Sequence, residues 1–374
     1  MARIGIDARY GFREQRRGIG NYVWHLVQEL GGLAPQHRFY LYLDPRCPPP
    51  QTVPPGHFRL RYLAAPVPTW FEQVALPRAA RRDRLDLLHG TANAAPLCCP
   101  CPTVLTLLDV IDFHRSRREL AQFTPRHRVS RRVRTLFLPA AARRARAVLT
   151  VSEHSRGEIC ALFRGLPPSR VRVVPLGITA LPPAGPLPAG VAPPYLLFLG
   201  AVDPRKNVVW ALGSLARALD RLPPDLSFVV VGSEDPELFI RAAAEAGLAE
   251  RTLCLGFVPP EQLSALYRHA LAFVYPSLAE GFGLPPLEAM AEGTPVLSSN
   301  ATSLPEVVGS AALLFSPRDP NSLVEQLVRL LHEPGLREEL GRRGAARAQA
   351  FTWERTARET LSVYEEVLAK ARRV

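Results

Sequence analysis

The chain has 374 residues, 47% of them hydrophobic, which suits about two globular domains of roughly 150 residues each. Its six cysteines do not suggest a disulfide-stabilised secreted fold, and no apolar run reaches the ~20 residues of a membrane-spanning helix, so we expect a cytoplasmic protein. The net charge of +12 is uneven, +16 in residues 1–190 and −4 in residues 191–374, which places any contact with a polyanion on the first half.

Short apolar segments alternate with helical patterns along the first half. This alternation predicts a parallel sheet covered by helices. Residues 178–194 contain six prolines and no charged residue, which is typical of a linker between domains. The predicted strands are 3–8, 39–43, 58–63, 85–89, 103–108, 147–151 and 171–175, and the predicted helices are 21–30 and 124–146.

The same alternation restarts after the linker. We therefore predict an α/β protein with two doubly wound domains, whose ligands bind beyond the carboxyl ends of the strands. The predicted parts are a first domain at 1–177, the linker at 178–194, a second domain at 195–355 and a final helix at 356–374. The second domain is expected to have strands at 195–200, 226–231, 252–255, 272–275, 295–298 and 312–314, and helices at 208–220, 236–246, 260–269, 285–292, 304–308 and 322–331.

The most informative stretch is the segment from Glu280 to Glu288, which follows the predicted strand 272–275. Gly281 and Gly283 allow a sharp turn without a Cβ in the way of a ligand. The prolines that follow suit the first turn of a helix, whose free N–H groups attract anions. Carboxylates at this place accept hydrogen bonds from hydroxyl groups, as on a ribose or a sugar, with one glutamate before the helix and one expected on its first turn.

This segment resembles the E-x7-E signature of retaining glycosyltransferases with the GT-B fold, in particular glycosyltransferase family 4. The resemblance covers nearly all of the chain. It implies two Rossmann-like domains facing each other across a cleft, with a C-terminal helix that crosses back to the first domain. It also implies a nucleotide-sugar donor, with Glu280 orienting the sugar, Glu288 holding the ribose, and Gly281, Phe282, Gly283 and Leu284 in the donor site.

Further donor-site residues follow from the same resemblance. Arg205 and Lys206, in a loop after the strand at 195–200, match the pyrophosphate loop, where cations neutralise a diphosphate. Many family members carry an arginine directly after the glycine of that loop, and here Ala201 stands instead. Ser303 is expected either to cap a helix or to touch phosphate. The loops at Gly232 and at Phe257 and Val258 are expected to border the nucleotide.

The first domain contributes fewer candidates. Gly18 and Gly20 open a helix whose backbone is expected to face the donor phosphates. Asp109 is a candidate catalytic residue at a strand end, although Leu108 replaces the histidine that family members often have there. His89 also follows a strand and is a candidate for lining the acceptor site.

Two arginine clusters lie in the first half. The first has aromatic and apolar neighbours, Trp70, Phe71 and Leu76, a combination that suits an anionic membrane surface or a lipid-diphosphate acceptor. No recognisable nucleic-acid-binding motif accompanies the clusters, so we expect no nucleic acid partner. A solvated basic face is the alternative explanation. The clusters are Arg78, Arg81, Arg82 and Arg84, and Arg126, Arg128, Arg131, Arg132 and Arg134.

The sequence therefore predicts transfer of a hexose-type sugar from a nucleotide sugar to a hydroxyl of a glycan, glycolipid or lipid-linked acceptor. No Asp-x-Asp motif is present, and Cys98, Cys99 and Cys101 have no second ligand pair at metal spacing, so we expect neither metal nor cofactor. Two alternatives remain, a nucleotide-sugar epimerase of the same architecture and a non-catalytic protein that binds nucleotide sugar or membrane.

Overall fold

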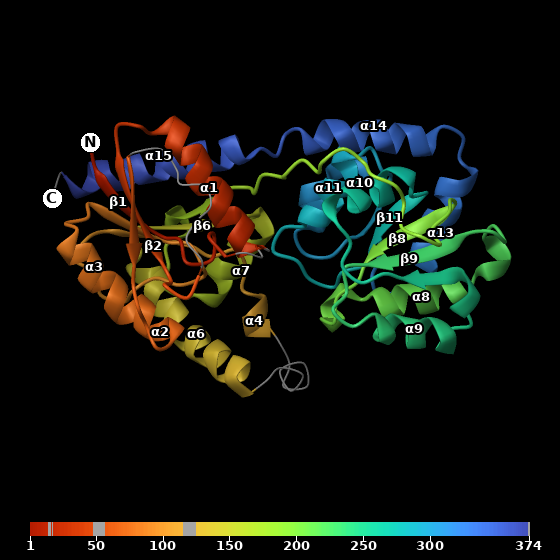
Figure 1. The fold of residues 1–374 in the computed structure, drawn as a ribbon, viewed down its shortest axis with the longest axis horizontal. Coiled ribbons are helices and arrows are strands. Elements are labelled where there is room, and N and C mark those ends of the chain that lie inside the picture. Colours follow the sequence, from red (N-terminus) through yellow and green to blue (C-terminus); the bar gives the residue numbers. More distant parts are fainter. Residues whose placement is uncertain (14–15, 17, 48–56, 115–124, 373–374) are drawn as a thin grey trace. The chain divides into compact units, whose positions relative to one another are not determined.

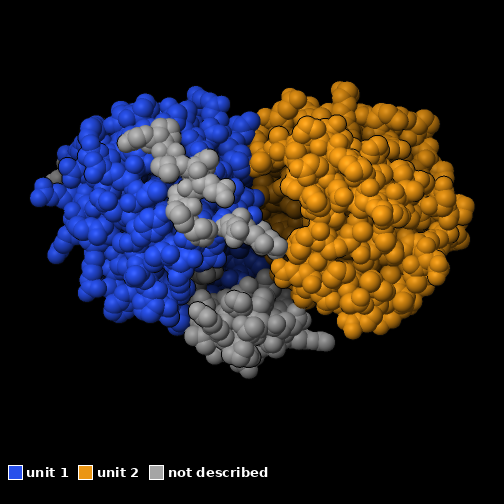
Figure 2. Space-filling view, in the orientation of Figure 1, with its two compact units in different colours: residues 1–177, 352–374 blue, residues 178–351 orange. Residues whose placement is uncertain are grey.

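The structure is a computed structural model that describes residues 1–13, 16, 18–47, 57–114 and 125–372; of residues 125–132 and 134 it describes only the backbone. The predicted arginine cluster at Arg126, Arg128, Arg131, Arg132 and Arg134 therefore has its side chains outside the described part. The chain forms two compact units (Figure 2), unit 1 from residues 1–177 and 352–374 and unit 2 from residues 178–351.

Unit 1 contains a seven-stranded parallel sheet in the order β3-β2-β1-β4-β5-β6-β7. The central strand β1 pairs with β2 through Ile4 and Phe39, and with β4 through Ile4 and Leu87. Nearly all positions of the central strands are buried, as expected for parallel strands covered on both faces. The strands are β1 Arg3–Asp7, β2 Arg38–Leu43, β3 Phe58–Tyr62, β4 Leu87–Gly90, β5 Thr103–Thr106, β6 Ala147–Thr150 and β7 Val171–Val173.

Helices cover both faces of this sheet, with α1 and α15 on one side and α3 and α6 on the other (Figure 1). The last helix, α15, belongs to unit 1 although it follows unit 2 in the sequence. Its first residue, Trp353, stacks on His25 of α1 with ring centroids 4.7 Å apart. The helices are α1 Ile19–Leu33, α2 Pro68–Trp70, a π-helical turn Phe71–Ala75, α3 Leu76–Arg82, α4 Ile111–His114, α6 Pro125–Arg144, α7 Glu153–Leu162 and α15 Trp353–Ala371.

Unit 2 contains a six-stranded parallel sheet in the order β10-β9-β8-β11-β12-β13. In both units the chain runs outward from a central strand, then returns to that strand's other side, which is the strand order of a doubly wound fold. The strands are β8 Tyr195–Leu199, β9 Ser227–Val231, β10 Thr252–Cys254, β11 Ala272–Tyr275, β12 Val296–Ser299 and β13 Leu313–Phe315.

The helices of unit 2 again lie on both sides of the sheet, α8 and α9 on one side and α10, α11 and α14 on the other (Figure 1). Aspartates open two of them, since Asp235 accepts the N–H of Leu238 and Asp319 that of Asn321, each followed by a proline at the first helical position. The helices are α8 Val208–Ala216, α9 Pro236–Glu245, α10 Pro260–His269, α11 Leu284–Ala291, α12 Leu304–Val308, α13 Pro320–His332 and α14 Leu336–Ala348.

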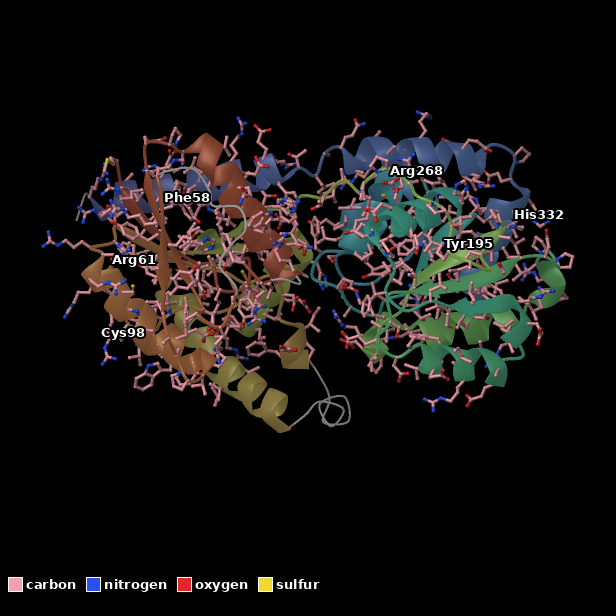
Figure 3. The ribbon with its side chains drawn as sticks, in the orientation of Figure 1. Phe58, Arg61, Cys98, Tyr195, Arg268 and His332 are labelled. Carbon is pink, nitrogen blue, oxygen red and sulfur yellow. The ribbon has the colours of Figure 1, made fainter. Side chains whose placement is uncertain are left out.

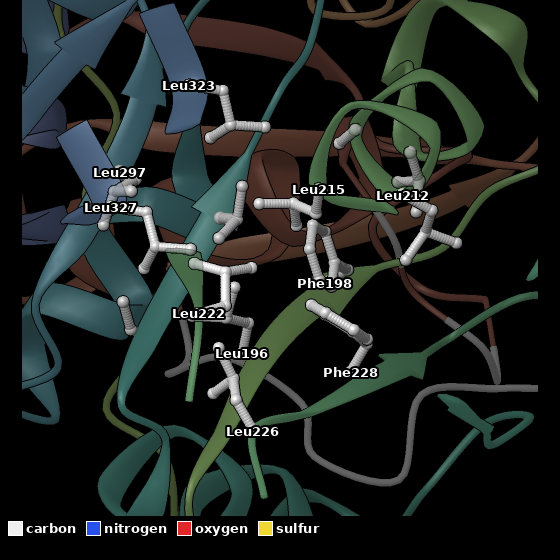
Figure 4. Packing of buried hydrophobic residues seen from close by; sticks show 14 of the residues in the cluster. Leu196, Phe198, Leu212, Leu215, Leu222, Leu226, Phe228, Leu297, Leu323 and Leu327 are labelled. Atoms are coloured by element: carbon white, nitrogen blue, oxygen red, sulfur yellow. The ribbon is translucent and has the colours of Figure 1, made fainter. Parts of the chain in front are cut away.

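The core of unit 2 lies between the sheet and helices α8, α9 and α13. Figure 4 shows Phe198 of β8 and Phe228 of β9 packed among leucines such as Leu212 of α8 and Leu327 of α13. Tyr195, at the start of β8, is fully buried in this sheet and donates its hydroxyl to the carbonyl of Leu266 at 2.7 Å. Figure 3 shows Tyr195 within the unit and His332 at its outer surface.

The thirteen strands of the structure lie where the sequence predicts them, with ends that shift by one or two residues in most cases. Two predictions about side chains are wrong. Phe71 and Leu76 lie in the core of unit 1, so only Trp70, 47% exposed, adds an aromatic surface beside the first arginine cluster. His89 is fully buried and cannot line an acceptor site, because it bonds Tyr364 of α15 at 2.6 Å and Thr106 of β5 at 2.7 Å.

Candidate active site

The candidate site of unit 2 lies at the carboxyl ends of β8 and β11, the neighbouring strands at which the strand order reverses. Loops that leave neighbouring strands in opposite directions open a crevice at such a point, which is where doubly wound sheets bind ligands. The loop after β8 contains Arg205 and Lys206, and the loop after β11 contains Glu280. The fold therefore brings together the three residues that the sequence predicts as the charged centre of the site.

The loop after β8 is shaped by its own side chains. The carboxylate of Asp203 accepts the N–H of Arg205 at 3.1 Å and caps the 3₁₀ turn Pro204–Lys206. Asn207 then adopts a left-handed conformation, with φ of 60°, before α8 begins. The carbonyl of Arg205 accepts the N–H of Leu278 at 2.8 Å, which ties this loop to the one after β11.

Glu280 is the centre of a hydrogen-bond network. Its Oε1 accepts from Lys206 Nζ at 2.8 Å, from the Tyr275 hydroxyl at 2.9 Å and from the Ser277 hydroxyl at 2.6 Å. Within the described part of the chain, its Oε2 accepts one contact, from Arg205 Nη1 at 3.5 Å. Since a carboxylate oxygen can accept more than one hydrogen bond, Oε2 retains capacity to accept one from a ligand hydroxyl.

The charge state of Glu280 follows from these contacts. Burial favours the neutral acid, but the charges of Lys206 and Arg205 and the hydrogen bonds from Lys206 and Ser277 outweigh it, so the pKa of Glu280 is lowered. Glu280 therefore stays ionised at neutral pH. The pKa of Tyr275 is raised well above its ordinary value by burial and by the Glu280 carboxylate, so this hydroxyl remains a donor.

The cations of the site are not in excess. Arg205 lies 3.4 Å from Asp203 and 3.5 Å from Glu280, and Lys206 lies 2.8 Å from Glu280, so two positive charges face two negative ones. Lys206 donates to Tyr275 at 2.7 Å as well as to Glu280. An ammonium group has three protons, so one remains for a ligand.

The glycine loop after Glu280 is held by the loop that precedes α12. Thr302 accepts the N–H of Glu280 at 2.9 Å, and the Ser303 hydroxyl donates to the carbonyls of Glu280 and Phe282. Ser303 makes no side-chain cap to α12, so its hydroxyl fixes this loop instead of capping a helix. Gly283 has φ of 121°, and a Cβ there would lie 2.6 Å from Leu304, so this position requires glycine.

The start of α11 offers fewer donors than a helix usually does. Gly283 is the N-cap and Leu284 the first helical residue, and the next two positions are prolines, which have no N–H. The free N–H groups at this end are therefore those of Gly283 and Leu284. This helix start therefore presents two amide donors to an anion, whereas an ordinary helix start presents four.

The sequence predicted Glu288 on the first turn of its helix, but it lies on the second turn of α11. It is half-buried, and its carboxylate makes no hydrogen bond or ion pair with the described residues. Burial raises the pKa of Glu288 to about 7. The fully buried hydroxyl of Tyr267 also lacks a hydrogen bond in the described part of the chain, and Glu288 is one of the charges that raise the Tyr267 pKa.

The remaining donor-site candidates of unit 2 differ in exposure. Gly232 has φ of 86° directly after β9, and its N–H donates to the carbonyl of Gly256 at 2.9 Å, so the loops after β9 and β10 are joined. Phe257 is 55% exposed at the end of that second loop, with the half-buried Val258 beside it. Phe282, by contrast, is buried edge-to-face against Phe351 at 5.7 Å, so only its backbone can face a ligand.

The candidates of unit 1 lie at the carboxyl edge of its own sheet. Gly18 is the N-cap of α1, with φ of 46°, and a Cβ at Gly20 would lie 2.9 Å from the carbonyl of Tyr10. Asp109 is half-buried three residues after β5, and its Oδ1 accepts the N–H of Ile111 at 3.1 Å. Both the helix start and the carboxylate thus lie where a doubly wound sheet places ligand-binding groups.

Sequence reasoning missed two groups of polar residues. Tyr275 was assigned only to the end of a strand and Ser277 to no role, although O–H donors five and three residues before Glu280 were a usable signal. In unit 1, the buried Arg9 lies 3.1 Å from Asp7 and 2.6 Å from Glu72. Burial raises the pKa of Asp7 to about 6, although the charge of Arg9 opposes that effect. Charged residues directly after an apolar strand were the available signal for this second group.

Comparison with known proteins agrees with this geometry. Residues 187–347 match the family model described as "Glycosyl transferases group 1", and residues 16–180 match "Glycosyltransferase Family 4". The chain belongs to glycosyltransferase family 4. Both matched regions contain the residues discussed above, since Arg205, Lys206 and Glu280 lie in the first and Asp109 in the second.

Two curated relatives of this family-4 chain are mannosyltransferases by name. It is 37% identical to O-antigen chain mannosyltransferase B of Escherichia coli over 241 residues. That alignment covers 59% of this chain and 61% of the relative. It is 36% identical over 235 residues to the MMP α-(1→4)-mannosyltransferase of Mycolicibacterium hassiacum, covering 61% and 56%. The alignments thus span about three fifths of the length of each relative.

Solved structures support the fold of this family-4 chain. Sucrose-phosphate synthase from Thermosynechococcus elongatus superimposes with a TM-score of 0.75 at 24% identity, over 99% of this chain and all of that one. HepE of Anabaena, solved in complex with UDP and glucose, gives a TM-score of 0.69 at 17% identity, over 98% of this chain and all of that one.

Two features are absent among the described residues. No three His, Cys, Asp or Glu side chains among them are placed to hold a metal ion together. None of their helices combines the length and the apolar character that crossing a bilayer requires.

Proposed function

We propose that this protein is a retaining glycosyltransferase that moves a hexose from a nucleoside-diphosphate sugar to a hydroxyl of a glycan, glycolipid or lipid-linked acceptor. The observation that carries the proposal is the partly buried Glu280–Lys206 pair at the strand-order reversal, 2.8 Å between charged atoms. Family membership and the names of the two relatives support the same chemistry. Because both relatives are named mannosyltransferases, mannose is the first sugar to test.

The diphosphate is the leaving group in such a reaction, and negative charge grows on it as the bond to the sugar breaks. The third ammonium proton of Lys206 and the N–H groups of Gly283 and Leu284 are the donors for that charge. Preorganised donors in a partly buried site stabilise such charge without a metal ion. We therefore propose that transfer is metal-independent, with Arg205 fixing the position of Glu280 and adding to the positive potential.

The two glutamates have separate roles in this proposal. Oε2 of Glu280 accepts a hydrogen bond from a sugar hydroxyl, while Oε1 is occupied by Lys206, Tyr275 and Ser277. The Glu288 carboxylate has no partner among the described residues and accepts hydrogen bonds from the ribose hydroxyls. Asp109 and the helix start at Gly18 and Gly20 supply the contacts of unit 1, Asp109 with the acceptor and the helix start with the donor phosphates.

A peripheral contact of unit 1 with anionic membrane is a further part of this proposal. Arg78 and Arg81 of α3 are exposed, and Trp70 lies on the same continuous helical segment. Arg82 is less available, since it lies 3.2 Å from Asp83. Basic residues beside an exposed indole suit an anionic lipid surface.

The test is a donor panel of UDP-glucose, GDP-mannose and related nucleotide sugars with hexoside acceptors. We expect release of nucleoside diphosphate together with a new glycoside whose anomeric configuration equals that of the donor, read by proton NMR. A changed sugar without acceptor would identify an epimerase, and donor binding without turnover in every combination would identify a non-catalytic protein. Inversion at the anomeric carbon would contradict the assignment of mechanism.

A further inference from the structure

Unit 1 has a groove at the amino edge of its sheet, the edge opposite to the one that carries Asp109. It has a volume of about 630 Å³, within the roughly 300–1,000 Å³ of small-molecule sites. The residues that begin β6 and β7 form one wall, and the last turns of α15 form the other. Asp109 follows the carboxyl end of β5, whereas the groove includes Pro102, directly before β5 begins, so the length of the strand separates them.

The lining of this groove is strongly basic. Arg146, Arg170, Arg172 and Lys370 face a single carboxylate, Glu366, which pairs with Arg172 at 3.1 Å. Neither Arg146 nor Lys370 forms an ion pair within the part of the chain that the structure describes. Several helical arginines elsewhere on the surface have a glutamate partner one turn away, such as Arg329 with Glu333 at 2.7 Å.

The position of one guanidinium is fixed before any ligand binds. Arg170 is half-buried, and its Nη1 donates to the carbonyl of Arg143 at 3.2 Å. The planar fork of this arginine keeps its other N–H groups for a ligand, and such forks suit the oxygens of phosphate. A preorganised guanidinium loses less conformational entropy on binding than a free surface side chain.

The floor of the groove is apolar, since Val363 and Val367 of α15 are buried with 7% and 6% of their surface exposed. A second hollow of 350 Å³ shares Pro102 and Arg146 with the first and adds Arg144. The two hollows therefore form one continuous basic surface with an apolar base. This combination fits a ligand that has a phosphate group and an apolar or sugar-like body.

We propose that this groove is a second ligand site, for a phosphate or diphosphate ester, separate from the donor site of unit 2. The C-terminal end of α15 has a partial negative charge that opposes an anion, but that is about half a unit charge against four cations and one carboxylate. The ligand is either a soluble phosphate ester or the headgroup of a lipid phosphate. The proposal does not depend on the glycosyltransferase activity, because none of its residues belongs to the candidate active site.

The test uses the full chain, with inorganic pyrophosphate and monomeric dihexanoyl phosphatidic acid as probes at low salt. Hydrogen–deuterium exchange locates binding, and calorimetric titration measures it. The variant is Arg146→Gln with Lys370→Gln, since neither side chain has an ion-pair partner among the described residues whose loss would disturb folding. The control is Arg217→Gln with Arg241→Gln, which removes the same charge at two exposed arginines of unit 2.

We expect a probe to protect residues 169–173 and 363–371 from exchange, and the variant to weaken that binding by at least about tenfold, the effect of one charge-assisted hydrogen bond. The control should bind like the parent. Pyrophosphate binding at residues 200–207 in unit 2 should persist in the variant. Protection by phosphatidic acid alone would identify the lipid source, and protection by pyrophosphate the soluble one. Absence of protection in both segments with both probes, or equal weakening by variant and control, would overturn the proposal.

Discussion

Replacing Glu288 with glutamine should stabilise the protein at high pH while weakening nucleotide binding. Burial raises the pKa of Glu288 from its ordinary 4.5 to about 7. A carboxyl with a raised pKa favours the folded state while it is protonated, and that stability is lost as pH rises from about 4.5 through 7. Glutamine is neutral throughout, so parent and Glu288→Gln should have similar stability at pH 5 and differ at pH 8.

The size of the difference follows from the same shift. Each tenfold change in proton affinity corresponds to about 1.4 kcal/mol, so the full shift sets an upper bound of about 3 kcal/mol. Because the carboxylate is only half-buried and keeps access to water, we expect a gain of about 1–2 kcal/mol at pH 8. Urea unfolding at both pH values measures it. Glu338→Gln, an exposed glutamate on α14, is the control and should gain nothing.

The functional half of this prediction uses the same variant. If Glu288 accepts hydrogen bonds from the ribose, its loss should weaken nucleoside-diphosphate binding by about 10–150-fold, the value of a charge-assisted hydrogen bond. Affinity of the parent should rise between pH 6 and 8 as Glu288 ionises, and the variant should lack that part of the rise. A variant that is no more stable at pH 8, or that binds nucleotide like the parent, would refute this account of Glu288.

Four other results are expected. Glu280→Gln should reduce transfer by at least about 100-fold yet bind nucleoside diphosphate as well as the parent or better, because Lys206 loses its charged partner; weaker nucleotide binding in calorimetry would argue against this division of labour. Chelator should leave most transfer activity, whereas Lys206→Ala should remove it, and activity restored only by Mn²⁺ or Mg²⁺ would contradict the metal-free mechanism. In low salt, Arg78→Glu with Arg81→Glu should weaken binding to anionic vesicles, measured by sedimentation, by about 1 kcal/mol per residue, with nucleotide binding unchanged. A parent protein that stays in the supernatant excludes the membrane contact. His89→Leu should cost about 1–3 kcal/mol of stability, because it leaves the buried Tyr364 hydroxyl unpaired and leaves the Thr106 hydroxyl with Tyr22 as its partner. Since the pKa of His89 is lowered to about 3, that cost should shrink as pH falls below 6.5, and a constant cost in urea unfolding would be inconsistent with a neutral buried imidazole.

Sequence reasoning reached the fold because parallel strands buried on both faces are continuous apolar runs, as in β8 and β11. It reached Arg205, Lys206 and Glu280 because strand-end loops meet at one edge of such a sheet. The charge balance of the site could not be predicted in this way. The pairing of Glu280 with Lys206 depends on side-chain geometry, which residue spacing in the sequence does not determine.

The error at His89 has the same physical origin. A histidine followed by glycine at a strand end resembles a ligand-binding loop. Its partner Tyr364 is 275 residues away in the sequence, and no local pattern indicates that the C-terminal helix covers this strand. Likewise, Phe71 and Leu76 appeared as companions of a basic surface, although one face of their helical segment packs into the core. Long-range packing decided each of these cases.

The return of α15 to unit 1 makes unit 2 an insertion within unit 1, because residues 178–351 are contiguous whereas unit 1 is assembled from two separate segments. During synthesis, unit 2 can complete its core as soon as residue 351 has left the ribosome. Unit 1 cannot complete its core at that point. The surface of α1 that contacts α15, and the buried His89 that bonds Tyr364, lack these partners until residues 353–371 have been synthesised. A chain that stops at residue 351 would therefore carry a complete unit 2 attached to a unit 1 with an uncovered apolar face. Such a truncated chain would be a substrate for chaperones and proteases, and excision of residues 178–351 as an independent fragment is the cleaner way to divide this protein.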